Sequence, residues 1–136
     1  MKFFAVIDTN VIVSAFLSRH ADAATVKVFQ HFLNRDLTLL FNDEILEEYR
    51  EVLTRPKFRI DKSLVMDLID FIHHEGVNSY RVKSDEIFQD PKDMVFYEVA
   101  LSKEDAYLVT GNLKHFPKKP IVVSPAEMLE ILKNKL

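Results

Sequence analysis

Residues 3–8 read Phe3-Phe4-Ala5-Val6-Ile7-Asp8, an unbroken apolar run that ends in an acid. Such a run is typical of a parallel strand that helices cover on both faces. Strand-like and helix-like segments alternate along the rest of the chain, which predicts an α/β fold with a parallel sheet. The further strands are expected at 37–41, 78–82, 106–110 and 121–123, and the helices at 10–19, 22–34, 43–53, 61–75, 90–102 and from 125 onward.

Three of the expected helices begin with sequence signals for a helix N-terminus. Asn42 can cap a helix whose first turn carries two acids, as the helix dipole favours. Asp90 precedes Pro91, and proline is preferred at the first helical position. The run Ser124-Pro125-Ala126-Glu127 has the pattern of a capping box.

Length and composition limit the class of protein. A chain of 136 residues is expected to form one domain, residues 1–136. It has no cysteine, which excludes disulfides, thiolate metal sites and a cysteine nucleophile and fits a reducing cytoplasm. No apolar run approaches the about 18 residues of a membrane span, so no membrane partner is expected. The net charge of −3 predicts no general basic surface, so a nucleic acid would have to bind local cations or metal ions.

Polar residues follow two of the expected strands. Asp8, Thr9 and Asn10 come directly after the first strand, and Thr110-Gly111-Asn112 follows a later one. Ligands of parallel α/β sheets bind beyond the carboxyl ends of the strands, which makes these residues candidates for a site. The alternatives are that Asp8 or Asn10 caps the next helix and that Thr110-Gly111-Asn112 is simply a turn.

Helical geometry selects one acid from the segment 43–53. At about 100° per residue, Glu48 falls at the edge of the apolar arc, beside Val52, whereas Glu47 points nearly to the opposite side. Glu48 is therefore the acid that can face the fold, and Glu47 is expected to be solvated. A salt bridge at the boundary of the helix is the alternative role for Glu48.

Two more acids stand at the start of the helix 90–102. Asp93 shares a face with Phe96 and Tyr97, so its carboxylate is expected to point inward, where it needs a partner or a metal ion. Asp90 is expected to act mainly as the helix cap.

Asp8, Glu48, Asp93 and Asn112 are thus expected at one end of one sheet. Clustered carboxylates repel each other unless a cation offsets their charge. Hard oxygen ligands suit Mg²⁺ or Mn²⁺, which commonly bridge protein carboxylates to phosphate oxygens. The pattern indicates metal-assisted hydrolysis of a phosphodiester.

The chain resembles the PIN domain family, in particular the small VapC-like PIN proteins that are toxin components of toxin–antitoxin pairs. The resemblance covers essentially the whole chain, and its motifs lie at residues 6–11, 48–58, 90–93 and 105–112. It implies a three-layer sandwich with a central parallel sheet of about five strands, and a metal-dependent ribonuclease. It also implies that the protein forms a homodimer and binds an antitoxin protein.

The family's acids carry over as Asp8, Glu48 and Asp93, and Asn112 stands where the family usually has a fourth acid. In the mechanism that the resemblance implies, Asp8 and Asp93 hold Mg²⁺ or Mn²⁺, and Glu48 completes the shell or orients the attacking water. Asn112 positions water or a phosphate oxygen. Thr9, Asn10, Asp90 and Thr110 are expected to support the site.

Two cationic runs are candidates for RNA binding. One contains Arg55, Lys57 and Arg59, and the other contains Lys114, His115 and Lys118. Cations next to aromatic rings suit splayed RNA bases and their phosphates. A solvated loop is the alternative for at least one of the two runs.

Two other functions compete with the nuclease. A PIN-fold module could bind RNA or a protein and cleave weakly or not at all, which Asn112 favours because it removes one negative charge. A receiver-type phosphoacceptor would need a second acid beside Asp8 and a lysine after the last strand. The sequence has neither, since Val123-Ser124-Pro125 ends that strand.

Overall fold

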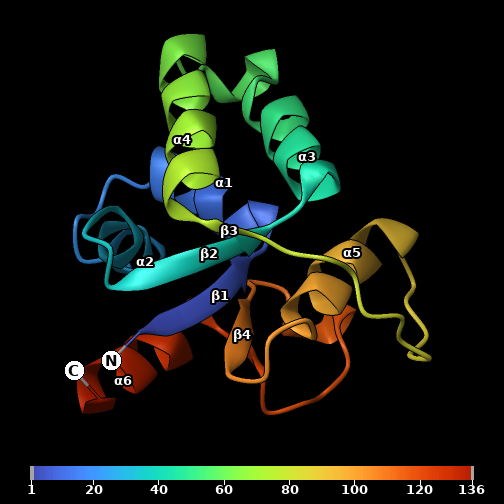
Figure 1. Cartoon of the computed structure of the whole chain (residues 1–136). Coiled ribbons are helices and arrows are strands. Elements are labelled where there is room, and N and C mark those ends of the chain that lie inside the picture. The colour runs from blue at the N-terminus through green and yellow to red at the C-terminus, as the bar shows by residue number, and fades with distance from the viewer. Residues whose placement is uncertain (1, 136) are drawn as a thin grey trace.

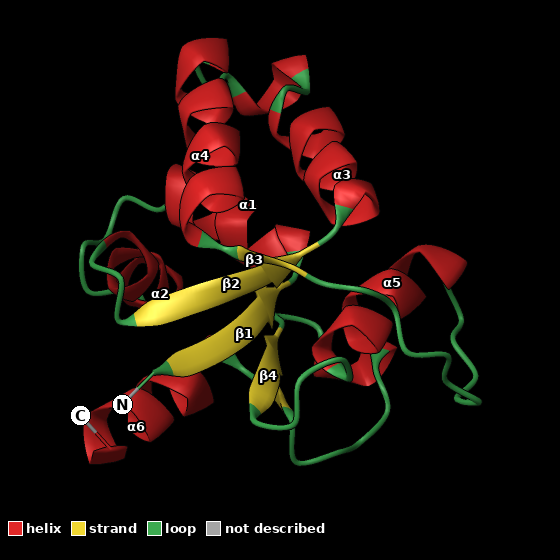
Figure 2. Ribbon diagram, in the orientation of Figure 1, coloured by secondary structure: helices red, strands yellow, loops and turns green. Residues whose placement is uncertain are grey.

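A computed structural model describes residues 2–135, which form a five-stranded parallel sheet with helices on both faces (Figures 1 and 2). The sheet order is β3-β2-β1-β4-β5. The strands are β1 (Phe3–Ile7), β2 (Leu37–Phe41), β3 (Val77–Asn78), β4 (Ala106–Val109) and β5 (Val122–Val123). The helices are α1 (Thr9–Leu17), α2 (Ala24–Leu33), α3 (Asp43–Leu53), α4 (Lys62–Glu75), α5 (Pro91–Ala100) and α6 (Pro125–Lys135), with short 3-10 helices η1 (Pro56–Phe58) and η2 (Leu113–His115).

The arrangement is the expected three-layer α/β sandwich. The apolar first strand, β1, lies at the centre of the sheet between β2 and β4. Helix α5 packs on β1 and β4, whereas α2 packs on β2 and beside α6. Helices α3 and α4 lie side by side and rise together above the sheet in Figure 1.

The predicted helix starts are confirmed by their hydrogen bonds. Asn42 and Asp90 each accept a hydrogen bond from an N–H group of the following first turn, at 2.9 Å. At α6, the Ser124 N–H donates to Glu127 Oε1 at 2.8 Å and the Glu127 N–H donates to Ser124 Oγ at 3.1 Å, which completes the capping box. These bonds satisfy N–H groups that have no partner within the helix itself.

The strand expected at 78–82 is much shorter in the structure. Pairing with β2 covers only Val77–Asn78, followed by one more bond from the Ser79 N–H to the Phe41 carbonyl at 2.7 Å. β2 ends there, so residues 79–90 turn away to reach α5 without regular structure. The other predicted elements are present, with ends that move by a few residues. Among residues 2–135, no helix is long and apolar enough to span a membrane.

Candidate functional site

Asp8 is placed by the register of the two central strands. Ile7 of β1 pairs with Val109 of β4, so the residues that follow them, Asp8 and Thr110, leave the sheet side by side. The Asp8 backbone starts α1, because its carbonyl accepts the Val11 N–H at 3.0 Å. Its side chain accepts the Thr110 hydroxyl at 2.8 Å and makes no capping hydrogen bond to α1. Capping therefore does not explain the carboxylate of Asp8.

The Asp8 carboxyl lies in an environment that disfavours its charge. Only 7% of the residue is exposed. Burial raises the pKa of Asp8 to about 6, the Thr110 hydroxyl opposes this rise, and the nearby Asp93 and Glu48 carboxylates add to it. A bound cation would reverse this penalty.

Thr110 connects Asp8 to the turn after β4. Its buried hydroxyl donates to Asp8 and accepts the Asn112 N–H at 3.0 Å. The Gly111 N–H in turn donates to the side chain of Asn10 at 3.2 Å, which ties this turn to α1. The two polar segments that follow β1 and β4 are therefore one connected unit.

Glu48 is brought to the site by its neighbour Tyr49. The Tyr49 ring is fully buried, and its hydroxyl donates to the carbonyl of Ile7, the last residue of β1. This bond holds α3 against the end of β1, and Glu48 faces the same pocket as Asp8. Glu47 is exposed and pairs with Arg50 at 2.6 Å, as the helical spacing predicts.

Asp93 points into the molecule from the first turn of α5. Its side chain is 18% exposed, and its Oδ2 lies 3.5 Å from Nδ1 of His115. Burial and the neighbouring Asp90 raise the pKa of Asp93, and His115 opposes that rise. Asp90 caps α5, as predicted, and also reaches the pocket.

The predicted residues meet in an open pocket of about 500 Å³. Arg55, Lys92 and His115 line the same pocket as its acids. Of the predicted site residues, those that line it are Asp8, Thr9, Asn10, Glu48, Asp90, Asp93, Asn112, Arg55 and His115. Thr110 lies behind Asp8 rather than on the surface of the pocket.

Each of the two predicted cationic runs has one RNA-binding candidate in the pocket and its other candidates elsewhere on the structure. Arg55 and His115 reach the pocket, whereas Lys114 and Lys118 line a separate hollow of about 640 Å³. Lys57 and Arg59 are exposed and lie outside the pocket lining, with the Lys57 ammonium 5.0 Å from the Phe58 ring centroid.

Sequence reasoning missed Lys92, Phe58 and Ser14, which also line the pocket. The position of Lys92 between Asp90 and Asp93, in the first turn of α5, was a usable signal. Phe58, between Lys57 and Arg59, also had a usable signal, whereas Ser14 carries none.

The pocket fits a hard divalent cation through its donors. These are carboxylate, amide and hydroxyl oxygens, which Mg²⁺ and Mn²⁺ prefer. Thr9 Oγ1, next to Asp8, is buried without a hydrogen-bond partner among the described residues, although buried hydroxyls normally have one. Within residues 2–135, however, no three Asp, Glu or His side chains stand close enough together to form a ready-made metal site. Asp8, Glu48 and Asp93 would therefore have to move closer together, or bind the ion partly through water.

A family model described as PIN domain matches residues 5–114, and the chain belongs to this family. The PIN domain is generally a nuclease fold, and PIN nucleases generally use divalent metal ions. No curated protein matches the chain.

Proposed function

We propose that this PIN-domain chain is an endoribonuclease that uses Mg²⁺ or Mn²⁺ to hydrolyse phosphodiester bonds of RNA. The observation that supports this best is the buried Asp8 carboxylate, which shares one pocket with Glu48 and Asp93. A pocket that raises the pKa of its central acid to about 6 gains most from a bound cation.

Asp8 and Asp93 would hold the ion, and Glu48, which lines the same pocket, would take part after a closer approach or through a water molecule. The unpartnered Thr9 hydroxyl is a further oxygen donor beside Asp8. A divalent ion bound there would supply Lewis-acid activation of water and of a phosphoryl oxygen. Thr110 holds the Asp8 carboxylate in its orientation, and Glu48 orients a water molecule for attack on phosphorus.

The cations of the pocket would bind the RNA backbone. Arg55 and Lys92 carry positive charge there, and His115 lines the pocket with them, which reconciles a phosphate substrate with the net charge of −3. Phe58 also lines the pocket and offers a ring on which a base can stack. Asn112 would orient water or a phosphate oxygen from the turn after β4.

The biological role that we propose is that of a toxin in a toxin–antitoxin pair, acting in the cytoplasm as a homodimer of a single domain, residues 1–136. The resemblance of the motifs to VapC-like proteins supports the toxin, the dimer and the antitoxin partner. One contiguous core that includes Phe3 and Leu132 supports the single domain. Expression of the wild-type chain in a bacterial host should arrest growth, and expression of Asp8→Asn should not.

A second candidate function is an RNA- or protein-binding module with weak or no cleavage. Two observations favour it: Asn112 lines the pocket at the place of a fourth acid, and the acids do not form a ready-made metal site within residues 2–135.

Cleavage of a labelled single-stranded RNA separates the two candidates. The assay compares Mn²⁺ or Mg²⁺ with EDTA, and the wild type with Asp8→Asn. Asp85→Asn is the matched control, because it makes the same change at an exposed acid outside the pocket. Cutting that needs metal and is lost only in Asp8→Asn supports the nuclease. RNA that is bound but left uncut by the wild type supports the binding module, and Asn112→Asp would then test whether the missing acid is the cause.

A further inference from the structure

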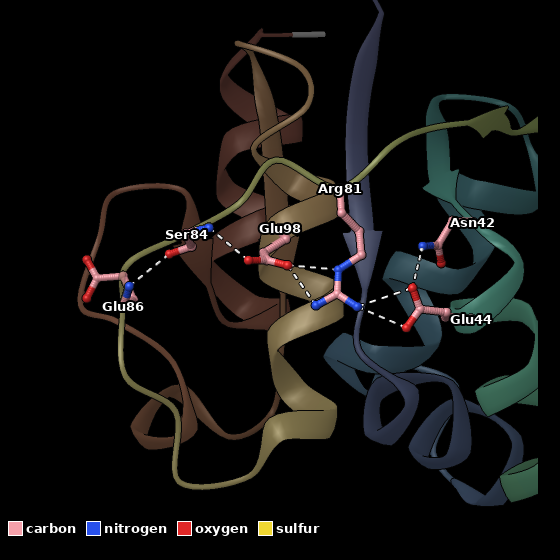
Figure 3. Close-up of polar contacts among 6 residues, drawn as sticks. All are labelled: Asn42, Glu44, Arg81, Ser84, Glu86 and Glu98. Carbon is pink, nitrogen blue, oxygen red and sulfur yellow. Dashed lines mark hydrogen bonds and ion pairs between the residues drawn. The ribbon is translucent and has the colours of Figure 1, made fainter.

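The connection between β3 and α5 is irregular but firmly attached to α5. The Val82 N–H donates to the Glu98 carbonyl at 3.0 Å, and the Ser84 N–H donates to the Glu98 carboxylate at 2.8 Å. Glu98 is only 5% exposed, and Figure 3 shows its carboxylate between Ser84 and Arg81. A loop of this length inside a compact fold usually has a function or a special packing role.

Arg81 of this loop joins two helices. Its Nε and Nη2 atoms contact Glu98 Oε1 of α5 at 2.8 and 2.7 Å. Its Nη1 atom contacts Glu44 of α3 at 2.9 and 3.2 Å (Figure 3). We call Glu44, Arg81 and Glu98 the arginine clamp.

The clamp spans the same two helices that carry Glu48 and Asp93. Glu44 lies one helical turn before Glu48 on α3, and Glu98 follows Asp93 on α5. A furrow of about 530 Å³ is lined by Glu44, Arg81, Glu48 and Lys92, and the last two also line the candidate site. The furrow beside the clamp therefore adjoins the candidate site, with Glu48 and Lys92 common to both.

Resting on the proposed function, we propose that Arg81 is a positioning residue that sets the separation of α3 and α5, and through it the gap between Glu48 and Asp93. The planar guanidinium can bind two carboxylates in fixed directions, which a lysine ammonium cannot do. Residues behind the ligands of a metal ion commonly control its affinity in this way.

Electrostatics explains why a clamp is needed here. Four glutamates line the furrow, Glu44, Glu47, Glu48 and Glu51, all from α3. Asp90 and Asp93 of α5 line the adjoining site pocket and carry the same charge. Glu47 and Glu51 are paired with arginines, Arg50 and Arg55. Glu48 of α3 and the two acids of α5 still repel each other within the site pocket, and the Arg81 guanidinium, bonded to both helices, opposes this repulsion.

Glu44→Gln is the sharpest test, because it removes the charge that holds α3 to Arg81, leaving at most one neutral hydrogen bond, and keeps the contacts of Glu98 with the loop in place. Glu44 is exposed, so the melting temperature should hardly change. Glu47→Gln is the matched control: it removes the same charge from the same furrow, but Glu47 pairs only along its own helix, with Arg50. The readouts are the Mn²⁺ dissociation constant and the kcat and KM for RNA cleavage.

We expect Glu44→Gln to weaken Mn²⁺ binding about tenfold and to lower kcat with little change in KM, because the contacts to RNA remain. Arg81→Met should act in the same direction and more strongly. Equal effects of Glu44→Gln and Glu47→Gln would overturn the proposal, since charge alone would then explain them.

A distance measurement tests the clamp without metal or substrate. The natural chain has no cysteine, so spin labels at Glu51→Cys and Lys92→Cys report on α3 and α5 alone. The distance distribution should broaden when Glu44→Gln is added and stay unchanged with Glu47→Gln. An unchanged distribution with Glu44→Gln would overturn the clamp. A wild type that neither binds Mn²⁺ nor cuts RNA would instead overturn the proposed function, and the distances would still decide the role of Arg81.

Discussion

Replacing Asp8 with asparagine should stabilise the metal-free protein at neutral pH. The buried carboxyl has its pKa raised from 3.8 to about 6, so the folded state holds a proton that the unfolded chain has already lost. A factor of ten in proton affinity corresponds to about 1.36 kcal/mol, so this difference costs the folded state about 3 kcal/mol once the pH is well above 6. Asparagine has nearly the same shape and can still accept the Thr110 hydroxyl, but it carries no charge.

The sign follows from proton linkage. Well below pH 3.8, Asp8 is protonated in both states, and the raised pKa of its carboxyl costs nothing. Between about pH 4 and pH 6 the unfolded chain binds fewer protons than the folded protein, so the wild type loses stability as the pH rises. The free energy of unfolding of Asp8→Asn should lack this decline.

Urea unfolding followed by circular dichroism at pH 4 and pH 7.5 measures the effect. We expect Asp8→Asn and wild type to differ little at pH 4, and Asp8→Asn to be more stable by about 3 kcal/mol at pH 7.5. Saturating Mn²⁺ should then stabilise the wild type alone, by about 2.7 kcal/mol at a hundredfold excess over the dissociation constant. A variant that is less stable than the wild type by the same amount at both pH values would refute the reasoning, and Asp85→Asn, at an exposed site, serves as the control.

Three further substitutions test other contacts of the site. Tyr49→Phe leaves the buried Ile7 carbonyl without the hydroxyl that donates to it and should lower the free energy of unfolding, measured in urea, by about 1–3 kcal/mol. Tyr80→Phe, at an exposed ring, should lower it little. Equal losses of stability in the two variants would contradict the role of the Tyr49 bond. Thr110→Val removes the hydroxyl that opposes the effect of burial, so the pKa of Asp8, followed by carboxyl NMR, should rise beyond about 6; a fall would contradict the structure. Lys92→Met should weaken RNA binding. It should also make the slope of log K against log salt concentration shallower by about 0.7. Lys57→Met, outside the pocket lining, should change neither the RNA affinity nor this slope. A larger effect of Lys57→Met than of Lys92→Met would place the RNA on the outer face of η1.

Local patterns predicted the fold because its strands and helix ends are local. The apolar run of β1 and the caps at Asn42, Asp90 and Ser124 depend on neighbouring residues, and each is found where the sequence indicates. The length of β3 was overestimated because it depends on where β2 ends, which the sequence of β3 does not contain.

The acids of the candidate site were predictable for the same reason, and the contacts that hold them were not. Asp8 directly follows an apolar strand and Asp93 follows the helix cap Asp90, so local sequence patterns predict where both acids lie. The bond from Tyr49 to the Ile7 carbonyl and the bridge from Arg81 to Glu44 join residues far apart in sequence. No pattern within either segment distinguishes those partners from other buried or charged residues.

Two cations of the pocket, Arg55 and Lys92, lie at η1 and at the start of α5, and this restricts how RNA could approach. The adjoining furrow is lined by four glutamates of α3, which outnumber its cations Arg81 and Lys92 and would repel a phosphate backbone. Arg55, Lys92 and His115 line the pocket itself, together with Phe58. An RNA strand would therefore enter over η1 and the start of α5, with its backbone turned away from the arginine clamp. Substitutions in the clamp should then change metal binding and kcat, whereas substitutions at Arg55 and Lys92 should change RNA affinity, so the two groups of residues can be separated by kinetics.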